Sequence, residues 1–273
     1  MKKSRSLLRK LAAYLYAALW ENRCRVCGAP CPPGDAITLC PKCAEELRPI
    51  REGFCPCCGQ ILKKTDKRRF FCPDCLFDPP PWQEIHLFGA YKNLLRDLLI
   101  DFKFRGNPAS GHLVGALLAR SMPDSFHNAP HILVPMPLSR ERLQERGFNQ
   151  VLELARPVIR RFSFPLATDI LTRVKNTAPQ SSLKGGERRA NITGAFSVAP
   201  DKVAGKHIIL MDDVMTTGCT LREAAKVLLA AGAASICVLI AARTPQPESD
   251  LQNSRSDSTS ENPLPVTDKI EPK

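Results

Sequence analysis

The chain has 273 residues, 44% of them apolar and 24% charged, an ordinary globular composition that excludes a chain disordered throughout. This length accommodates one medium domain and a second, smaller one. The net charge of +12 favours polyanionic partners such as nucleotides, nucleic acid or anionic lipid, although a basic, solvated surface accounts for the same charge.

Residues 1–21 predict a short amphipathic helix. Leucines recur along this segment at helical spacing, at Leu7, Leu8, Leu11, Leu15 and Leu19. A basic start followed by an apolar stretch is also typical of an export signal. Residues 11–20 are too few to cross a bilayer. We therefore expect no membrane span and favour a helix that docks on the protein or on a partner.

Residues 22–80 predict a zinc-binding module, because eight of their ten cysteines form four C-x-x-C pairs, the spacing of zinc ligands. The sequential quartets are Cys24, Cys27, Cys40 and Cys43, followed by Cys55, Cys58, Cys72 and Cys75. An interleaved arrangement, in which the first pair joins the third, is compatible with the same spacing. Four thiolates leave no open position, so each zinc ion is structural and supplies folding energy that the few apolar residues do not.

The density of cysteine would also suit a secreted disulfide scaffold. The paired spacing favours metal instead, so we expect a reducing, cytoplasmic compartment. Cys31 and Cys57 are left over as spare thiols, while Gly28 and Gly59 follow their pairs as tight turns around sulfur require. Prolines at 79–81 end the module as a stiff linker.

Residues 81–243 predict an α/β domain in which a parallel sheet is flanked by helices, because strands and helices alternate. We expect helices at 91–104, 109–121, 139–162 and 219–231, and strands at 131–136, 166–174, 195–198, 206–214 and 235–241. Residues 175–194 predict a long loop, whose length is typical of a functional segment. Residues 244–273 are rich in serine, proline and acids and predict a disordered tail.

The strongest functional signal is an apolar run at 207–211 that leads into Asp212 and Asp213. The acids are followed by a short loop that opens a helix, with the residues Val214, Met215, Thr216, Thr217, Gly218, Cys219 and Thr220. The carboxyl end of a parallel strand opens into a ligand crevice, and the start of a helix offers free N–H groups to a phosphate. The acids suit ribose hydroxyls, magnesium or an electron-poor sugar carbon. An ordinary turn with capping threonines is the alternative.

This segment resembles the signature of type I phosphoribosyltransferases. The resemblance implies that Asp212 and Asp213 are the catalytic acids that contact the ribose of phosphoribosyl pyrophosphate. It also implies that residues 214–220 bind its 5′-phosphate, and that Mg²⁺ accompanies the pyrophosphate.

Basic residues precede this signature. Residues 134–190 contain eleven Lys or Arg and five Asp or Glu, and a pyrophosphate leaving group requires such cations as charge develops on it. We select Arg140 and Lys175 as candidate ligands of phosphoribosyl pyrophosphate. Any single arginine here is also explained as a solvated surface charge.

Residues 22–243 as a whole resemble the ComF family, including its GntX-like members. The resemblance rests on the C-x-x-C pairs, on the segments 134–138, 146–150 and 177–181, and on the acidic signature. It implies a link to natural transformation, with single-stranded DNA and DNA-uptake or recombination proteins as partners. Two functions stay open: a phosphoribosyltransferase with an unknown acceptor, and a non-catalytic accessory protein that binds single-stranded nucleic acid. Aromatic residues are only 6% of the chain, which weakens base stacking but leaves phosphate contacts open.

Overall fold

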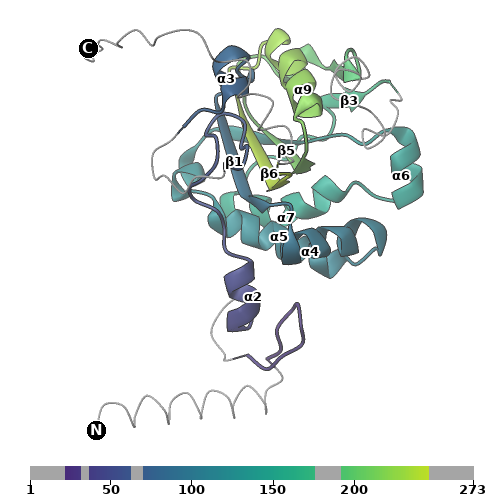
Figure 1. Cartoon of the computed structure of the whole chain (residues 1–273). Helices are drawn as coiled ribbons and strands as arrows, with labels where there is room; N and C mark the ends of the chain where they lie inside the picture. The colour runs from purple at the N-terminus through teal and green to yellow at the C-terminus, as the bar shows by residue number, and fades with distance from the viewer. Residues whose placement is uncertain (1–21, 32–36, 63–69, 176–191, 246–273) are drawn as a thin grey trace, which may run out of the picture.

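The computed structural model describes residues 22–31, 37–62, 70–175 and 192–245 (Figure 1). The predicted helix at 1–21, most of the loop predicted at 175–194 and nearly all of the predicted tail lie outside these residues. A four-stranded parallel sheet forms the centre, in the order β1 (Glu84–Ala90), β6 (Ser235–Arg243), β5 (His207–Met215) and β2 (His131–Pro135). The predicted α/β architecture is therefore confirmed.

Helices cover both faces of the sheet (Figure 1). One face is covered by α4 (Asn93–Phe104), α5 (Pro108–Ser121) and α7 (Gln150–Phe162), and the other by α9 (Cys219–Ala230). Because both faces of the sheet are covered, β6 is buried along almost its whole length, which explains why its sequence is an almost continuous apolar run. Within the described part of the chain, no helix combines the length and apolarity needed to cross a bilayer.

The edge strand β1 was not predicted. Its sequence mixes Glu84 and His86 with apolar residues and contains Gly89, so it shows neither regular alternation nor a continuous apolar run. The strand forms because it pairs in parallel with β6, about 150 residues later in the chain. Long-range pairing of this kind leaves no local signal.

The single helical stretch expected at 139–162 is wrong. It forms two helices, α6 (Arg140–Arg146) and α7, because Gly147 ends α6 in the left-handed region at φ 73°. The side chain of Ser139 caps α6, and the side chain of Asn149 caps α7. The Nδ2 of Asn149 also donates to the carbonyl of Met136 at 3.1 Å, which fixes both helices to the end of β2.

The strand expected at 166–174 is much shorter than predicted. Only β3 (Leu171–Arg173) forms, and it pairs antiparallel with β4 (Phe196–Val198) outside the main sheet. Leu166 makes one isolated bridge to Leu133 in β2. The described residues of the domain also include two short 3₁₀ helices, η1 (Asp124–Asn128) and η3 (Pro200–Lys202).

The cysteine module consists of two ribbons, each with one short helix, α2 (Pro41–Glu46) and α3 (Pro73–Phe77). The first ribbon projects from the α4 side of the domain, whereas α3 lies near α9 (Figure 1). The turns at Gly28 and Gly59 have φ of 71° and 69°, as the sequence predicts for tight turns.

Candidate phosphate and ribose site

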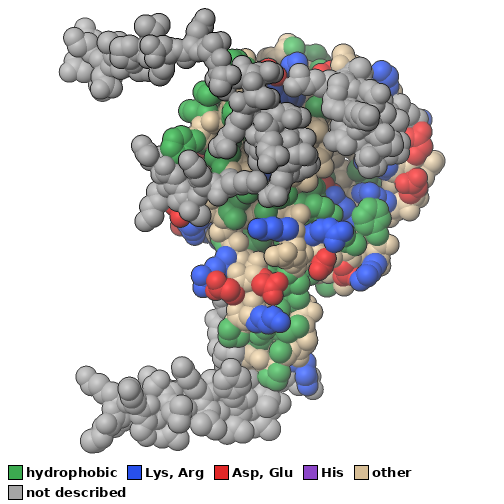
Figure 2. Space-filling view, viewed as in Figure 1, with side chains coloured by type: hydrophobic (Ala, Val, Ile, Leu, Met, Phe, Trp, Pro, Cys, Tyr) green, Lys and Arg blue, Asp and Glu red, His purple; other side chains and the backbone are tan. Residues whose placement is uncertain are grey.

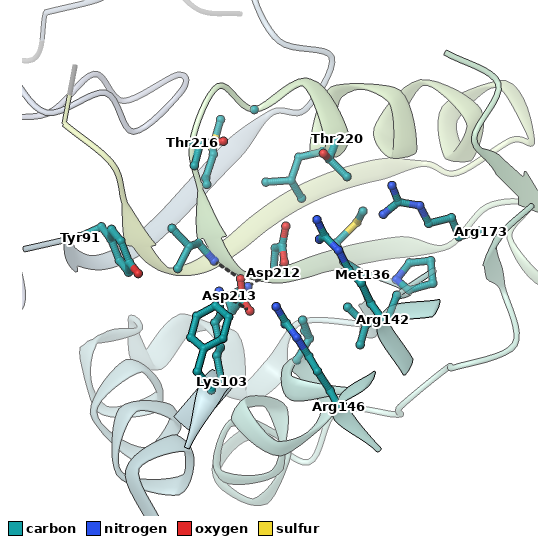
Figure 3. Close-up of a pocket in the computed structure, with 18 residues that line it drawn as sticks. Tyr91, Lys103, Met136, Arg142, Arg146, Arg173, Asp212, Asp213, Thr216 and Thr220 are labelled. Carbon is teal, nitrogen blue, oxygen red and sulfur yellow. Dashed lines mark hydrogen bonds and ion pairs between the residues drawn. The ribbon is translucent and has the colours of Figure 1, made fainter. Parts of the chain in front are cut away.

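A cavity of about 330 Å³ opens at the carboxyl end of β5, between the first turn of α9 and α6 (Figure 3). The predicted site residues that line it are Asp212, Asp213, Val214, Met215, Thr216, Gly218 and Thr220. Thr217 and Cys219 belong to the same loop but do not line the cavity, and Thr217 Oγ1 accepts a hydrogen bond from the amide of Cys219 at 3.5 Å. The structure thus brings most of the predicted loop around one cavity.

The loop after β5 enters directly into α9, a helix of 12 residues. Gly218 is the N-cap residue and has φ 81°, a conformation that L side chains rarely adopt, and an added Cβ would overlap the Cε of Met215. The free N–H groups and the positive dipole end of α9 therefore face the cavity, beside the hydroxyl-bearing residues Thr216 and Thr220. This arrangement can bind a phosphate group.

The two acids lie at the base of the cavity and differ in their partners. Asp213 is buried, and its Oδ2 lies 2.8 Å from the Nζ of Lys103 in α4. Its Oδ1 accepts from the amide of Val214 at 2.5 Å. Asp212 is half-buried and accepts only the amide of Asp213, at 2.8 Å, among the hydrogen bonds of the described residues. Asp212 is therefore the acid with more capacity for a ligand.

The pKa of Asp212 also distinguishes it as the acid available to a ligand. Burial, followed by the nearby charge of Asp213, raises the pKa of the Asp212 carboxyl from 3.8 to about 7, against the opposing influence of Lys103 and Arg142. A carboxyl group that titrates near neutral pH can exchange a proton during a reaction, and such groups cluster at functional sites.

Three arginines also line the cavity: Arg142 and Arg146 from α6, and Arg173 from β3 (Figure 3). Arg142 and Arg146 are four residues apart, so they lie on the same face of α6. Burial lowers the pKa of the Arg146 and Arg173 guanidinium groups, which nevertheless stay charged. Arg140 and Lys175, the cations selected from the sequence, are exposed and do not line the cavity. The i, i+4 spacing of Arg142 and Arg146 in the sequence was the better signal for which cations line the cavity.

Four lining residues from outside the basic segment were not predicted: Tyr91, Lys103, Phe104 and Leu221. A weak signal existed for Lys103, because it follows the buried Leu95 and Leu99 at intervals of four residues and so lies beside the apolar face of α4. The guanidinium of Arg146 lies 5.5 Å from the ring centre of Phe104, a cation–π contact at the mouth of the cavity.

The cysteines assemble as the two sequential quartets and not in the interleaved arrangement. In each quartet the four Sγ atoms lie within 4.8 Å of one another. The Sγ atoms of Cys27 and Cys40 are 3.6 Å apart, and those of Cys58 and Cys72 are 3.5 Å apart. Four converging thiols are the donor set of a structural zinc site, so the residues fit one zinc ion per quartet.

Comparisons with known proteins agree with both parts of the chain. A family model described as a phosphoribosyl transferase domain matches residues 151–268, and one described as a double zinc ribbon domain matches residues 15–76. Competence protein F of Haemophilus influenzae is 31% identical over 73% of this chain and 88% of its own length. DNA utilization protein YhgH of Escherichia coli is 32% identical, over 81% and 96%. Competence protein ComFC of Bacillus subtilis is 30% identical, over 72% and 80%.

Proposed function

Because the chain belongs to the ComF family, we propose that it binds magnesium phosphoribosyl pyrophosphate and acts in the handling of DNA taken up by the cell. One observation carries the first part: two acids, the start of α9 and four basic side chains converge on one cavity. A ligand with a phosphate, a vicinal diol and a pyrophosphate matches these three kinds of group. The thiol ligands favour a reducing, cytoplasmic compartment.

In this proposal the 5′-phosphate binds at the start of α9, and the ribose hydroxyls donate hydrogen bonds to Asp212. The pyrophosphate contacts Arg142, Arg146 and Arg173, which offset the negative charge that develops as it leaves. Magnesium, when bound, neutralises part of the charge of the pyrophosphate.

Transfer would break the bond between the anomeric carbon and the pyrophosphate oxygen and form a bond from that carbon to an acceptor nucleophile. The proton of the nucleophile must be removed, and Asp212 has a pKa suited to accept it near neutral pH. The acceptor class is open, so binding of phosphoribosyl pyrophosphate is the part to test first.

The test is a calorimetric titration with magnesium phosphoribosyl pyrophosphate, using a matched pair of arginine variants. Arg142 lines the cavity, whereas Arg140 lies in the same helix, is exposed and does not line it. Loss of one charge-assisted contact costs roughly 1.5–3 kcal/mol. We therefore expect Arg142→Ala to weaken binding about tenfold or more and Arg140→Ala to leave it unchanged. An absence of heat with the unmodified protein would refute the proposed ligand.

Binding of single-stranded DNA is a second candidate function, favoured by exposed apolar side chains on the second ribbon. Phe71, Leu76 and Phe77 are 54%, 67% and 90% exposed. Exposed aromatic rings on which bases can stack are typical of sequence-tolerant binding of single strands. Basic side chains lie over α4 and beside α6, with acidic side chains among them, and this region is separate from α3 (Figures 1 and 2).

Fluorescence anisotropy with a labelled oligonucleotide at several salt concentrations tests this candidate. Affinity should fall steeply with salt because phosphate contacts release counterions. Phe77→Ser and Arg140→Glu should each weaken DNA binding without changing the affinity for phosphoribosyl pyrophosphate, since neither residue lines the cavity. Absence of binding at low salt would restrict the protein to a small-molecule role.

A further inference from the structure

The second zinc ribbon, which contains Cys55, Cys58, Cys72 and Cys75, and the loop at residues 214–220, here called the phosphate loop, are joined by one buried side chain, that of Arg243. This residue ends β6, is only 5% exposed, and pairs in register with Met215 at the end of β5. Its guanidinium group therefore lies where the strand ends of the sheet meet the turn of the second ribbon.

The guanidinium donates hydrogen bonds to both of these partners and, through Nη1, to the carbonyl of Thr244, the next residue, at 3.3 Å. On the ribbon side, Nε donates to the carbonyl of Cys58 at 3.3 Å and Nη2 donates to Oε1 of Gln60 at 2.9 Å. On the loop side, Nη1 donates to the carbonyl of Met215 at 3.0 Å and to the carbonyl of Thr216. Cys58 belongs to the second cysteine quartet, and Met215 and Thr216 line the cavity.

The turn of the second ribbon at residues 55–60 is itself held in place by backbone hydrogen bonds around this contact. The amide of Cys55 donates to the carbonyl of Gln60 at 2.8 Å, and the amide of Gly59 donates to the carbonyl of Cys55 at 2.8 Å. Gln60 is 3% exposed, so its amide oxygen has little access to water as an alternative partner. The position of the ribbon turn therefore sets where the guanidinium can lie.

Two further side chains attach the same ribbon to the domain. Trp82 Nε1 donates to the carbonyl of Cys57 at 2.7 Å. Arg222, in the first turn of α9, donates through Nη2 to the carbonyl of Asp78 at 2.7 Å and through Nη1 to that of Pro79 at 3.2 Å. The second ribbon thus contacts both sides of the phosphate loop, the strand end before it and the helix after it.

We propose that the second zinc ribbon positions the phosphate loop for binding of phosphoribosyl pyrophosphate. Arg243 is the positioning residue, because it holds the loop carbonyls of Met215 and Thr216. The proposal rests on the proposed function of the cavity. Metal bound by the second quartet fixes the ribbon turn, the turn fixes Arg243, and Arg243 orients the loop that receives the 5′-phosphate.

The first ribbon provides the internal control, because its contacts lie elsewhere. Its cysteine cluster packs against Leu94, at the start of α4, and the segment that follows it donates a hydrogen bond from the amide of Ile50 to the carbonyl of Phe88 at 2.9 Å. Neither of these contact residues lines the cavity. Metal in the first quartet should therefore have little influence on the loop.

The experiment compares full-length, zinc-loaded variants by calorimetric titration with magnesium phosphoribosyl pyrophosphate at 10 °C, with zinc content measured in parallel. Arg243→Met should raise Kd at least tenfold while the binding stoichiometry stays near that of the unmodified protein. Arg48→Met, at a site 71% exposed beside the first ribbon, should change neither value. Arg243→Lys keeps a positive charge in the buried site and serves as the second variant if Arg243→Met does not fold; its single ammonium cannot reach both partners, so its Kd should also rise.

The two quartets are compared in the same way. Cys58→Ser and Cys27→Ser should each remove one zinc ion, but only Cys58→Ser should weaken binding. A fall in stoichiometry at unchanged Kd would show that Arg243 only supports folding and would overturn the proposal, as would equal effects of the two cysteine variants.

Failure of the proposed function remains distinguishable from failure of this inference. If the unmodified protein does not bind phosphoribosyl pyrophosphate, deuterium uptake of the loop and first turn of α9, residues 214–222, decides the structural coupling. Arg243→Met and Cys58→Ser should both increase uptake there, and Cys27→Ser should not. Unchanged uptake in Arg243→Met would overturn the inference.

Discussion

Replacing Asp212 by asparagine should stabilise the protein at alkaline pH while weakening its proposed ligand binding. Burial and the neighbouring Asp213 raise the pKa of Asp212 from 3.8 to about 7 in the folded state. The folded protein therefore binds the proton more tightly than the unfolded chain does. This contribution to stability is fully present below about pH 4 and is lost as the pH rises to about 7.

The magnitude follows from the two pKa values. A difference of about three pH units corresponds to roughly 4 kcal/mol at about 1.4 kcal/mol per unit, which is an upper bound for one half-buried group. Asn has the same shape and no charge to desolvate, so Asp212→Asn should recover about 1–4 kcal/mol at pH 8.5. For a domain of this size, each kcal/mol raises Tm by about 2–4 °C.

Thermal unfolding at pH 5 and pH 8.5 measures this effect. The advantage of Asp212→Asn over the unmodified protein should be larger at pH 8.5, because at pH 5 the folded protein already holds Asp212 protonated. The exposed Asp201 provides a matched control, and Asp201→Asn should behave like the unmodified protein at both values. An Asp212→Asn variant that is less stable than the unmodified protein at pH 8.5 would refute the reasoning.

The same variant should lose affinity for magnesium phosphoribosyl pyrophosphate by at least tenfold, since a ribose hydroxyl loses a charge-assisted hydrogen bond of roughly 1.5–3 kcal/mol. A gain in stability together with a loss of binding is the signature of a functional carboxylate and not of a structural one. Asp213→Asn is less informative, because it also removes the carboxylate that lies 2.8 Å from Lys103.

Three further predictions concern metal, loop and core. Elemental analysis should find about two zinc ions per chain, and a chain purified with none, without exposure to chelators, would contradict the ribbon assignment. Gly218→Val should weaken binding of phosphoribosyl pyrophosphate without changing zinc content, because a β-branched residue at φ 81° distorts the loop. Unchanged affinity would show that the loop does not contact the ligand. Gly115→Ala should lower the free energy of unfolding by about 1–3 kcal/mol in urea titrations, since the added Cβ would lie 2.5 Å from the carbonyl oxygen of Leu154, where α5 and α7 pack. An unchanged midpoint of urea unfolding would contradict this close approach.

The sequence by itself determined those parts of the protein whose chemistry is local. The spacing predicted the four C-x-x-C pairs, because two thiols on one tight turn converge whatever the rest of the chain does. Which pairs join was left open by the spacing, and the structure decided for the two sequential quartets. The acidic pair and the loop after β5 were predicted together with their helix, because strand, loop and helix start are consecutive in the chain. The parallel sheet followed from the alternation of elements.

Only the tertiary structure decided which distant side chains reach the site. Lys103, Arg142 and Arg173 come from three different elements and meet Asp212 only because the sheet and its helices bring them together. Arg140 and Lys175 belong to the same basic segment as Arg142 and Arg173 and are equally suitable by sequence, yet they are exposed and do not line the cavity.

The same limit applies to the second ribbon, which the sequence presented as a separate module. Its attachment to the phosphate loop runs through Arg243, about 185 residues from Cys58 in the chain. Spacing rules describe neighbours along the chain, and a hydrogen bond across the fold exists only once packing has placed donor and acceptor together and excluded water from both.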